Sequence, residues 1–430
     1  MAFRFFGGSL PSMARVLSAV IFGFGVDWRL RLGLSACLIP GLGYADNAAY
    51  QQFFFAVCQD PVGALADRCA ETPGALGGLS GNSQNSLNPT QGLALPGTLD
   101  AVGSARDRQL RNELESSAPA SGFVLDQGPV SVLVNMRTGW DTLDRAQNTP
   151  TTRGFDAERY AIEIGLDARV SDRLVLGLLG ALEQSSLEFG PGAPGVNFTP
   201  VTSSGSIDTD SRVVIAYADW TFGTAAYLDV LLSLSDDDMR FERNAEFQEI
   251  RRVAPQVAVR TRGDTSGRRA ALTAVLGSEI ARGAYAFGYS LGLTAARVAV
   301  DSFLERDQSA SGLAMRFENV EQDAVSGHLG ISVSRSVPFA GGVLVPHIRT
   351  EYQHAFNADR DTGAAAFSGD PSASVFAFAG EPVDRSQVVV AAGVTGILPN
   401  GWLPFINLES LFGIKDLSQY RLVVGLRREW

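Results

Sequence analysis

Polar and apolar residues alternate with a period of two along much of the chain. Between residues 159 and 170 the odd positions are charged or small, whereas the even positions are apolar. A β-strand places successive side chains on opposite faces, so this segment predicts a strand with one apolar and one polar face. The same alternation recurs at 284–298, 324–335 and 344–356.

The alternation predicts about twelve strands, and the connections between them differ in length. The strands begin near residues 130, 158, 173, 210, 225, 267, 284, 323, 342, 385, 401 and 417. Short turns are expected near 171–172, 222–224, 282–283, 338–341 and 399–401. Long connections are expected at roughly 141–156, 188–208, 236–266, 301–321 and 357–384. Long and short connections alternate until the last hairpin, near Lys415.

Two all-β architectures compete for this pattern. A soluble β-sandwich turns its apolar faces inward, and its turns have no reason to alternate in length. An outer-membrane barrel has an even number of strands, apolar side chains toward lipid, polar ones toward the lumen, and long loops on one rim. After residue 45 no stretch approaches the ~18 to 20 apolar residues of a transmembrane helix. We therefore predict an all-β fold, a transmembrane antiparallel β-barrel.

Residues 1–45 predict a signal peptide. Arginines precede apolar runs, and Gly43 and Ala45 place small residues at the third and first positions before a cleavage site. We expect cleavage after Ala45, although Met13 is an alternative start.

Residues 46–97 predict a short passenger or linker segment. An exported chain reaches an oxidising compartment, where the pair Cys58 and Cys69 favours a disulfide loop. Residues 74–97 are rich in Gly, Ser, Asn, Gln and Pro, the composition of a linker.

A helix is predicted at 98–117, within a linker region that extends to residue 122 and precedes the barrel at 123–430. The segment contains no proline, and Thr98 is a suitable N-cap. It lacks an apolar stripe, and at ~1.5 Å per residue it would reach about 30 Å, comparable with a bilayer core. It is either a solvated helix or a polar helix threaded through a hydrated pore.

Charged residues occupy the polar face of the predicted strands. The predicted lumen wall comprises Arg159, Glu163, Asp167, Arg169, Glu279, Arg349, Glu351 and Glu409. We interpret them as a hydrated wall on which the 98–117 helix docks, since charges in a channel need partners or water. The helix arginines that would meet such carboxylates are Arg106, Arg108 and Arg111.

Composition limits the functions that the chain could have. With 46 acidic and 35 basic residues, its net charge of −11 argues against nucleic-acid binding. An enzyme would need a nucleophile or activated water beside a base, and the only histidines are His328, His347 and His354. We expect the first two to face the lumen and the third the lipid interface, as structural residues. We predict no catalytic residue, cofactor or metal site.

Three segments of the C-terminal half carry a family resemblance. They are VPHIRTEYQHAFN (Val345–Asn357), VAAGVTGILPNGWLPFINLESLFG (Val390–Gly413) and LSQYRLVVGLRREW (Leu417–Trp430). Together they resemble the translocator barrel of classical, type V, autotransporters, over about residues 123–430. The final strand is similar to the C-terminal signal that the barrel-assembly machinery reads, and that signal would comprise Leu422, Val424, Leu426 and Trp430. Arg428 departs from the family pattern, which usually has an apolar residue there.

The resemblance implies a function in secretion. In that family an N-terminal passenger is exported and a linker helix remains in the pore, so this chain would export or display its short N-terminal segment. It implies a location in the bacterial outer membrane, with the segment in the pore or at the cell surface. The implied partners are outer-membrane lipid, the barrel-assembly machinery and periplasmic chaperones, with the chain a monomer. A porin-like channel plugged by the N-terminal helix is the alternative, and an outer-membrane enzyme the third.

Overall fold

The computed structural model describes part of the chain, all of it within the compact unit Gly43–Trp430. The described residues are 57–66, 129–144, 154–190, 198–200, 205–223, 225–249, 257–356, 362–379 and 384–430. The predicted signal peptide, the predicted 98–117 helix and Cys69 lie outside them.

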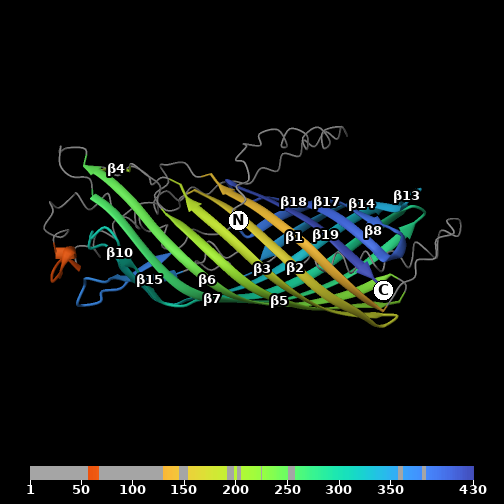
Figure 1. Ribbon diagram of the computed structural model, residues 1–430, viewed down its shortest axis with the longest axis horizontal. Coiled ribbons are helices and arrows are strands. Elements are labelled where there is room, and N and C mark those ends of the chain that lie inside the picture. Colours follow the sequence, from red (N-terminus) through yellow and green to blue (C-terminus); the bar gives the residue numbers. More distant parts are fainter. Residues whose placement is uncertain are drawn as a thin grey trace, which may run out of the picture. The chain divides into compact units, whose positions relative to one another are not determined.

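Twelve long antiparallel strands form a closed barrel (Figure 1). They are β1 (Val130–Leu143), β2 (Phe155–Ser171), β3 (Leu174–Phe189), β5 (Ser206–Phe222), β6 (Ala226–Glu249), β7 (Val257–Arg282), β8 (Tyr285–Val300), β12 (Val320–Arg335), β14 (Gly342–Ala355), β17 (Ser386–Ile397), β18 (Trp402–Phe412) and β19 (Leu417–Glu429). Each pairs with its neighbours in sequence, and β1 pairs with β19 to close the ring. The predicted barrel fold is confirmed.

Shorter strands lie at the two rims of the barrel. On the rim of the short turns lie β13 (Val337–Phe339) and the 3-10 turn Pro399–Gly401. On the opposite rim β4 (Phe198–Pro200) and β10 (Arg306–Asp307) extend the barrel sheet. A second sheet, which we call the cap, has the strand order β16 (Phe376–Ala379), β15 (Thr362–Phe367), β11 (Met315–Phe317) and β9 (Phe303–Leu304).

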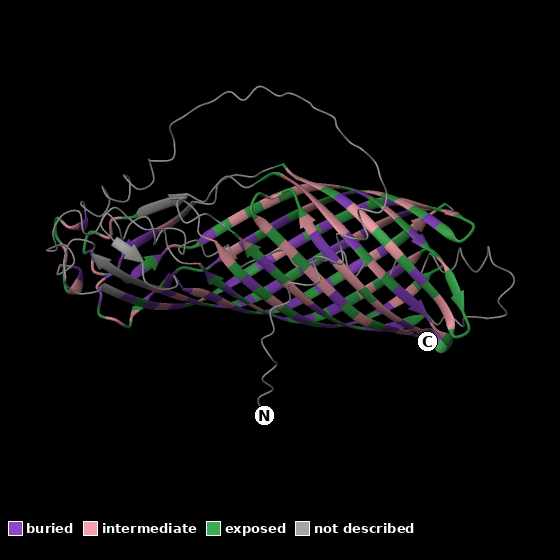
Figure 2. Cartoon of the chain, turned by 90° about the horizontal axis from the view of Figure 1, so that it is seen from above, coloured by how far each residue is buried: buried purple, intermediate pink, exposed green. Residues whose placement is uncertain are grey.

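Side chains of the barrel strands alternate between the two faces as predicted, which Figure 2 shows as bands of buried and exposed residues. On β2, Ile162 and Leu166 are 52% and 59% exposed, whereas Glu163 and Asp167 between and beside them are 2% and 3% exposed. The outward residues from Tyr160 to Val170 span about 23 Å at ~3.3 Å per residue and a ~45° tilt, close to the ~25 Å apolar band of outer-membrane barrels.

The connections follow the predicted alternation, with one correction. Apart from the turn around Lys415, the short turns lie on the rim where the barrel begins and ends, and there Trp430 donates its backbone N–H to the carbonyl of Val130 at 3.1 Å. The segment 236–266 was predicted to be a long connection, and most of it is strand. There β6 and β7 remain paired as far as Phe247 and Val257, so the long β6–β7 hairpin projects beyond the apolar band.

The polarity of the two faces reverses within this hairpin. On β6 the outward side chain of Leu234 is exposed and apolar, whereas farther along the strand the outward Asp238 is charged and the inward Phe241 is buried. The inward apolar residues beyond the reversal form one cluster with the cap. Its members include Leu187, Phe189, Ile207, Met239, Phe241, Val259 and Val300 of the barrel and Phe303, Leu313, Met315, Phe317, Ala365 and Phe367 of the cap.

Candidate functional site

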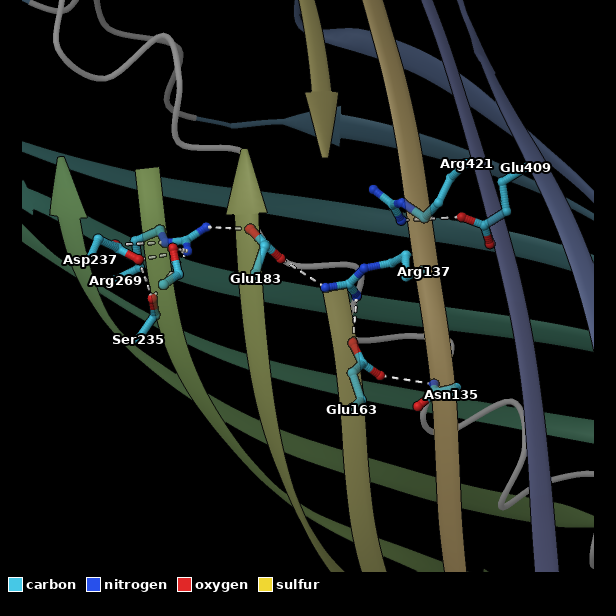
Figure 3. Close-up of polar contacts among 10 residues, drawn as sticks. Asn135, Arg137, Glu163, Glu183, Ser235, Asp237, Arg269, Glu409 and Arg421 are labelled. Atoms are coloured by element: carbon cyan, nitrogen blue, oxygen red, sulfur yellow. Dashed lines mark hydrogen bonds and ion pairs between the residues drawn. The ribbon is translucent and has the colours of Figure 1, made fainter. Parts of the chain in front are cut away.

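Oppositely charged side chains form a connected row on the inner wall, which we call the charged belt (Figure 3). Arg137 on β1 contacts Glu163 on β2 at 3.0 Å and Glu183 on β3 at 2.9 Å. The second carboxylate oxygen of Glu163 accepts a hydrogen bond from Asn135 at 2.9 Å.

The belt continues across β3 to β6 and β7. Arg269 on β7 lies 3.7 Å from Glu183. Its Nε and Nη2 atoms donate to the two carboxylate oxygens of Asp237 on β6 at 2.9 and 2.8 Å, a bidentate pair. Nη2 also donates to Ser211 and Ser235. The signs therefore alternate along the belt, and each buried charge has a partner, as burial requires.

Two further polar groups continue around the wall. Arg159 pairs with Asp141 at 2.8 Å, and Asp141 also accepts a hydrogen bond from Gln419. On the other side of β1, Glu409 lies between Arg349 at 2.9 Å and Arg421 at 3.2 Å. Strand pairing brings these residues together, because β14, β17, β18, β19, β1 and β2 are neighbours in the ring.

His328 lies between a carboxylate and a hydroxyl. Its Nδ1 is 3.0 Å from Glu351 and its Nε2 is 2.8 Å from the Thr294 hydroxyl. Hydroxyl, imidazole and acid follow the order of a catalytic triad, but such a site also needs donors aimed at an oxyanion. Here the backbone of β8 and β12 is paired in the barrel ladder, and Thr294 also bonds Thr273. The arrangement is that of a hydrogen-bonded lumen wall.

A fifth polar group, the terminal cluster, lies near the rim of the barrel termini. Arg427 of the last strand is 1% exposed and donates to Asp167 on β2 and to Ser131 on β1. Asp167 also accepts hydrogen bonds from Ser131 at 2.6 Å and from Tyr217 at 2.7 Å. A Cβ on Gly177 would lie 2.1 Å from the Tyr217 ring, so glycine leaves the space that this aromatic side chain fills. The cluster ties the last strand to β1, β2 and β5.

The structure places the predicted lumen residues on the inner wall but divides them among these separate groups. Glu163 belongs to the charged belt, Asp167 to the terminal cluster, and Arg159, Glu351 and the Arg349 and Glu409 pair to the other groups. Arg169 and Glu279, on the inward register of β2 and β7, are half-buried. Arg106, Arg108 and Arg111 lie outside the described residues, so docking of a helix on this wall stays a prediction.

Sequence reasoning missed several wall residues. They are Arg137, Glu183, Asp237, Arg269 and Arg427. Each occupies an inward position of the same two-residue period, so extending the alternation to every strand would have found them. Asp237 lies inside the segment 236–266 that was predicted as a long connection, so its place on β6 was missed, whereas Arg269 lies in the strand predicted to begin near residue 267.

The closing strand turns its apolar residues outward. Val424, Leu426 and Trp430 are exposed on the outer face and Leu422 is half-buried. Arg428, the departure from the family pattern, has its guanidinium 4.8 Å from the Trp402 ring and 5.1 Å from the Trp430 ring. Cation–π contact with two indoles explains how a cation is accommodated on this face.

The other two histidines lie as expected. His347 is half-buried on the inward register of β14, beside Gly393 of β17. His354 lies on the outward register between the rings of Tyr352 and Phe356 and is hydrogen-bonded to Ser386 at 2.9 Å.

The segment 57–66 contacts the cap. Val57 and Leu65 are each 1% exposed and belong to the cap cluster, and Cys58 packs against it. The N–H of Val62 donates to the carbonyl of Gly369 at 3.2 Å. Cys58 is disulfide-bonded, in agreement with the predicted loop, but the other cysteines lie outside the described residues.

Carboxylate side chains fix the conformation of the loops beside the cap by accepting hydrogen bonds. Asp307 accepts hydrogen bonds from Ser309, from Ser311 and from the N–H of Gly312 at 2.7 Å. Burial alone would raise the pKa of Asp307, but these hydrogen bonds outweigh it and hold the pKa below its ordinary range. Glu305 forms a buried bidentate pair with Arg243 of β6.

Neither a metal site nor a membrane-spanning helix occurs among the described residues. No group of three or more His, Cys, Asp or Glu in this part of the chain is arranged to hold a metal ion. None of the helices among the same residues has the length and apolar character to cross a membrane.

Comparisons with known proteins agree on the barrel. A family model described as autotransporter beta-domain matches residues 134–409. The translocator domain of the autotransporter NalP from Neisseria meningitidis is similar, with a TM-score of 0.54 and 14% identity over 77% of this chain and 98% of that chain. The transport unit of AIDA-I from Escherichia coli gives a TM-score of 0.48 and 11% identity over 74% of this chain and 97% of that chain. No curated protein sequence matches. At this identity the NalP structure supports a shared fold alone.

Proposed function

Because the chain belongs to the autotransporter beta-domain family, we propose that its barrel exports the chain's own N-terminal segment and displays residues 57–66 at the cell surface. Members of this family are outer-membrane translocator barrels, which transport and do not catalyse. The barrel therefore spans the outer membrane, and its long connections and the turn around Lys415 lie on the outer rim, with the other short turns on the periplasmic rim.

The observation that carries the proposal is the position of 57–66. This segment contacts the cap at the outer rim, whereas β1 begins at Val130 beside Trp430 on the periplasmic rim. Residues 67–128 must therefore connect the two rims. A polar, irregular chain is not tolerated in contact with lipid, whereas a polar lumen solvates it. This supports a path for 67–128 through the lumen.

The charged wall suits such a path. Carboxylates on the wall, such as Glu163 and Glu351, and cations such as Arg349 would give a charged linker polar surroundings along part of the pore. We extend the proposal to the partners. Outer-membrane lipid would cover the outward apolar band, and periplasmic chaperones and the barrel-assembly machinery would receive the monomeric chain.

Surface labelling of amines in intact cells tests the proposal. Lys415 is the only lysine, and it is exposed on the outer rim, so it serves as an internal positive control. An Asp60→Lys variant adds a second amine at an exposed position of the displayed segment. An Arg173→Lys variant adds one at an exposed short turn on the periplasmic rim.

Peptide mass spectrometry then reads each position after treatment with a membrane-impermeant amine reagent. We expect labelling at positions 60 and 415 in intact cells, and labelling at position 173 only after the outer membrane is permeabilised. Labelling at 415 without labelling at 60 in intact cells, with both labelled after permeabilisation, would refute display of the segment.

A further inference from the structure

We propose that the cap is a docking surface for residues 57–66, so that the exported segment remains bound to the outer rim of its own barrel. The inference rests on the proposed export and names the partner of the exported segment. That partner is the cap of the same chain together with the apolar end of the β6–β7 hairpin, which packs against it in one cluster.

The cap has an apolar surface. The rings of Phe241, Phe303 and Phe317 stack in series, with centroids 4.8 and 4.6 Å apart. Val57 and Leu65 enter this cluster from the segment and are almost completely removed from solvent. Val62, between them, is 51% exposed. A ten-residue segment that buries two aliphatic side chains in an aromatic cluster is bound by the hydrophobic effect, since each such burial is favourable.

Two glycines from different loops, Gly312 and Gly369, lie against the segment, and we call this contact site the seat. A Cβ on Gly312 would lie 2.4 Å from the carbonyl carbon of Ala64 and 2.5 Å from the backbone nitrogen of Leu65. A Cβ on Gly369 would lie 3.0 Å from the Cβ of Leu65 and 3.2 Å from the carbonyl oxygen of Val62. The segment's backbone occupies the volume that a side chain would need at Gly312, whereas a Cβ at Gly369 would be in tight contact that a shift of a few tenths of an ångström relieves, so the two loops are shaped to receive the segment.

The seat is ordered by contacts within the cap itself. Asp307 holds the turn that carries Gly312, as described above. Beside Gly369, Asp370 accepts hydrogen bonds from the N–H groups of Ser372 at 2.9 Å and Ser374 at 2.7 Å. Arg243 donates to the carbonyl of Leu313 at 2.7 Å. A preorganised surface loses less entropy when its ligand binds, which strengthens docking.

The covalent link between segment and barrel favours docking as well. Since both belong to one chain, binding is intramolecular and its effective concentration is set by the connecting residues. Two buried aliphatic residues that would give weak binding between separate molecules can therefore keep a tethered segment in place. The segment is accordingly retained at the surface rather than released.

Disulfide trapping tests docking in the full-length protein. Leu65→Cys combined with Gly369→Cys places two thiols where the Cβ positions are 3.0 Å apart, within reach of a disulfide after small adjustment. We expect most of the protein in oxidised cells to carry this link, detected as a reducible pair of peptides. The matched control, Leu65→Cys with Val337→Cys on the periplasmic rim, should give none. Equal linking in both pairs, or in neither, would overturn the proposal.

Hydrogen exchange provides a second measurement that does not depend on thiols. Leu65→Asp puts a charge into the apolar cluster, whereas Val62→Asp puts the same charge at an exposed position. We expect the 57–66 peptide of Leu65→Asp to exchange at least about tenfold faster than that of the natural chain, with the peptides of β2 unchanged. Val62→Asp should remain close to the natural chain. Equal exchange in the two variants would contradict docking.

Surface labelling and disulfide trapping together separate docking from export. Labelling of Asp60→Lys in intact cells together with failed trapping would leave export standing and refute docking. Absence of that labelling, with Lys415 labelled, would refute the proposed function itself.

Discussion

Removal of the Arg137 guanidinium tests whether the charged belt stabilises the barrel. Arg137 lies between Glu163 and Glu183, and its side chain is 9% exposed. At ~4 Å between charge centres and an effective dielectric constant near 20, each pair contributes about 4 kcal/mol of Coulomb energy, much of which offsets desolvation. Breaking one buried pair typically costs about 3–5 kcal/mol, and water in a lumen reduces this. For Arg137→Gln we expect a loss of roughly 2–4 kcal/mol in the free energy of unfolding.

A double-mutant cycle isolates the pairwise part of this loss. Arg137→Gln, Glu183→Gln and the double variant are unfolded reversibly in denaturant from lipid vesicles, with loss of heat-modifiable migration as the second probe. Because the partners are in contact at 2.9 Å, their effects should not add, and the coupling should exceed about 1 kcal/mol.

An exposed pair provides the matched control. Arg297 and Asp323 form an ion pair at 2.7 Å on β8 and β12, but their side chains are 61% and 57% exposed. Exposure weakens such a pair even though it is bidentate, so the cycle of Arg297→Gln and Asp323→Asn should give a coupling well below that of the belt. Equal coupling in the belt and in this control would refute the argument that burial gives the belt its stabilising effect.

Three further predictions concern other parts of the molecule. Leu426→Asp, or deletion of Trp430, should reduce the amount of heat-modifiable barrel in the membrane by misassembly, because these outward residues form the predicted assembly signal; normal yields of both variants would contradict it. Deletion of residues 46–128 should leave a folded barrel with much higher conductance in a planar bilayer, whereas conductance equal to that of the full chain would favour a porin-like channel. The protection factor of the peptide around Asp307, which is its exchange rate corrected for the intrinsic slowing of amide exchange in acid, should decrease as the pH falls below about 4, since a group with a lowered pKa stabilises the fold at neutral pH and loses this contribution as it becomes protonated; the same pH dependence of the protection factor in Asp307→Asn would refute this assignment.

The period-two pattern predicted the barrel well because the bilayer imposes it. Every strand that crosses must turn apolar residues such as Ile162 outward, and a polar lumen allows charged residues such as Glu163 inward. This constraint acts on each strand separately, so it can be read locally along the chain. It gave the number of strands, their approximate starts and the direction of the side chains.

The partners of the inward residues could not be read in the same way. Arg427 donates to Asp167 across 260 positions of sequence, and this contact exists because the last strand pairs with the first. Arg269 meets Glu183 although β7 and β3 are not neighbouring strands, because long side chains reach across the wall. Alternation places a residue on the wall, but closure of the ring and side-chain reach determine its partner.

The segment 236–266 was predicted as a connection because the surroundings of the two faces of its strands change along their length. Within the membrane the outer face must be apolar, but beyond it the outer face meets water and the inner face meets the cap. The two faces of β6 therefore exchange polarity between Leu234 and Phe241 without a break in the strand. Beyond the membrane the strand keeps its period of two but turns polar residues outward and apolar residues inward. A search for strands with apolar residues outward therefore finds no pattern in this segment. The reversal follows from a strand that leaves the bilayer and continues as an ordinary water-soluble sheet with an apolar interior, and that interior is the surface on which Val57 and Leu65 lie.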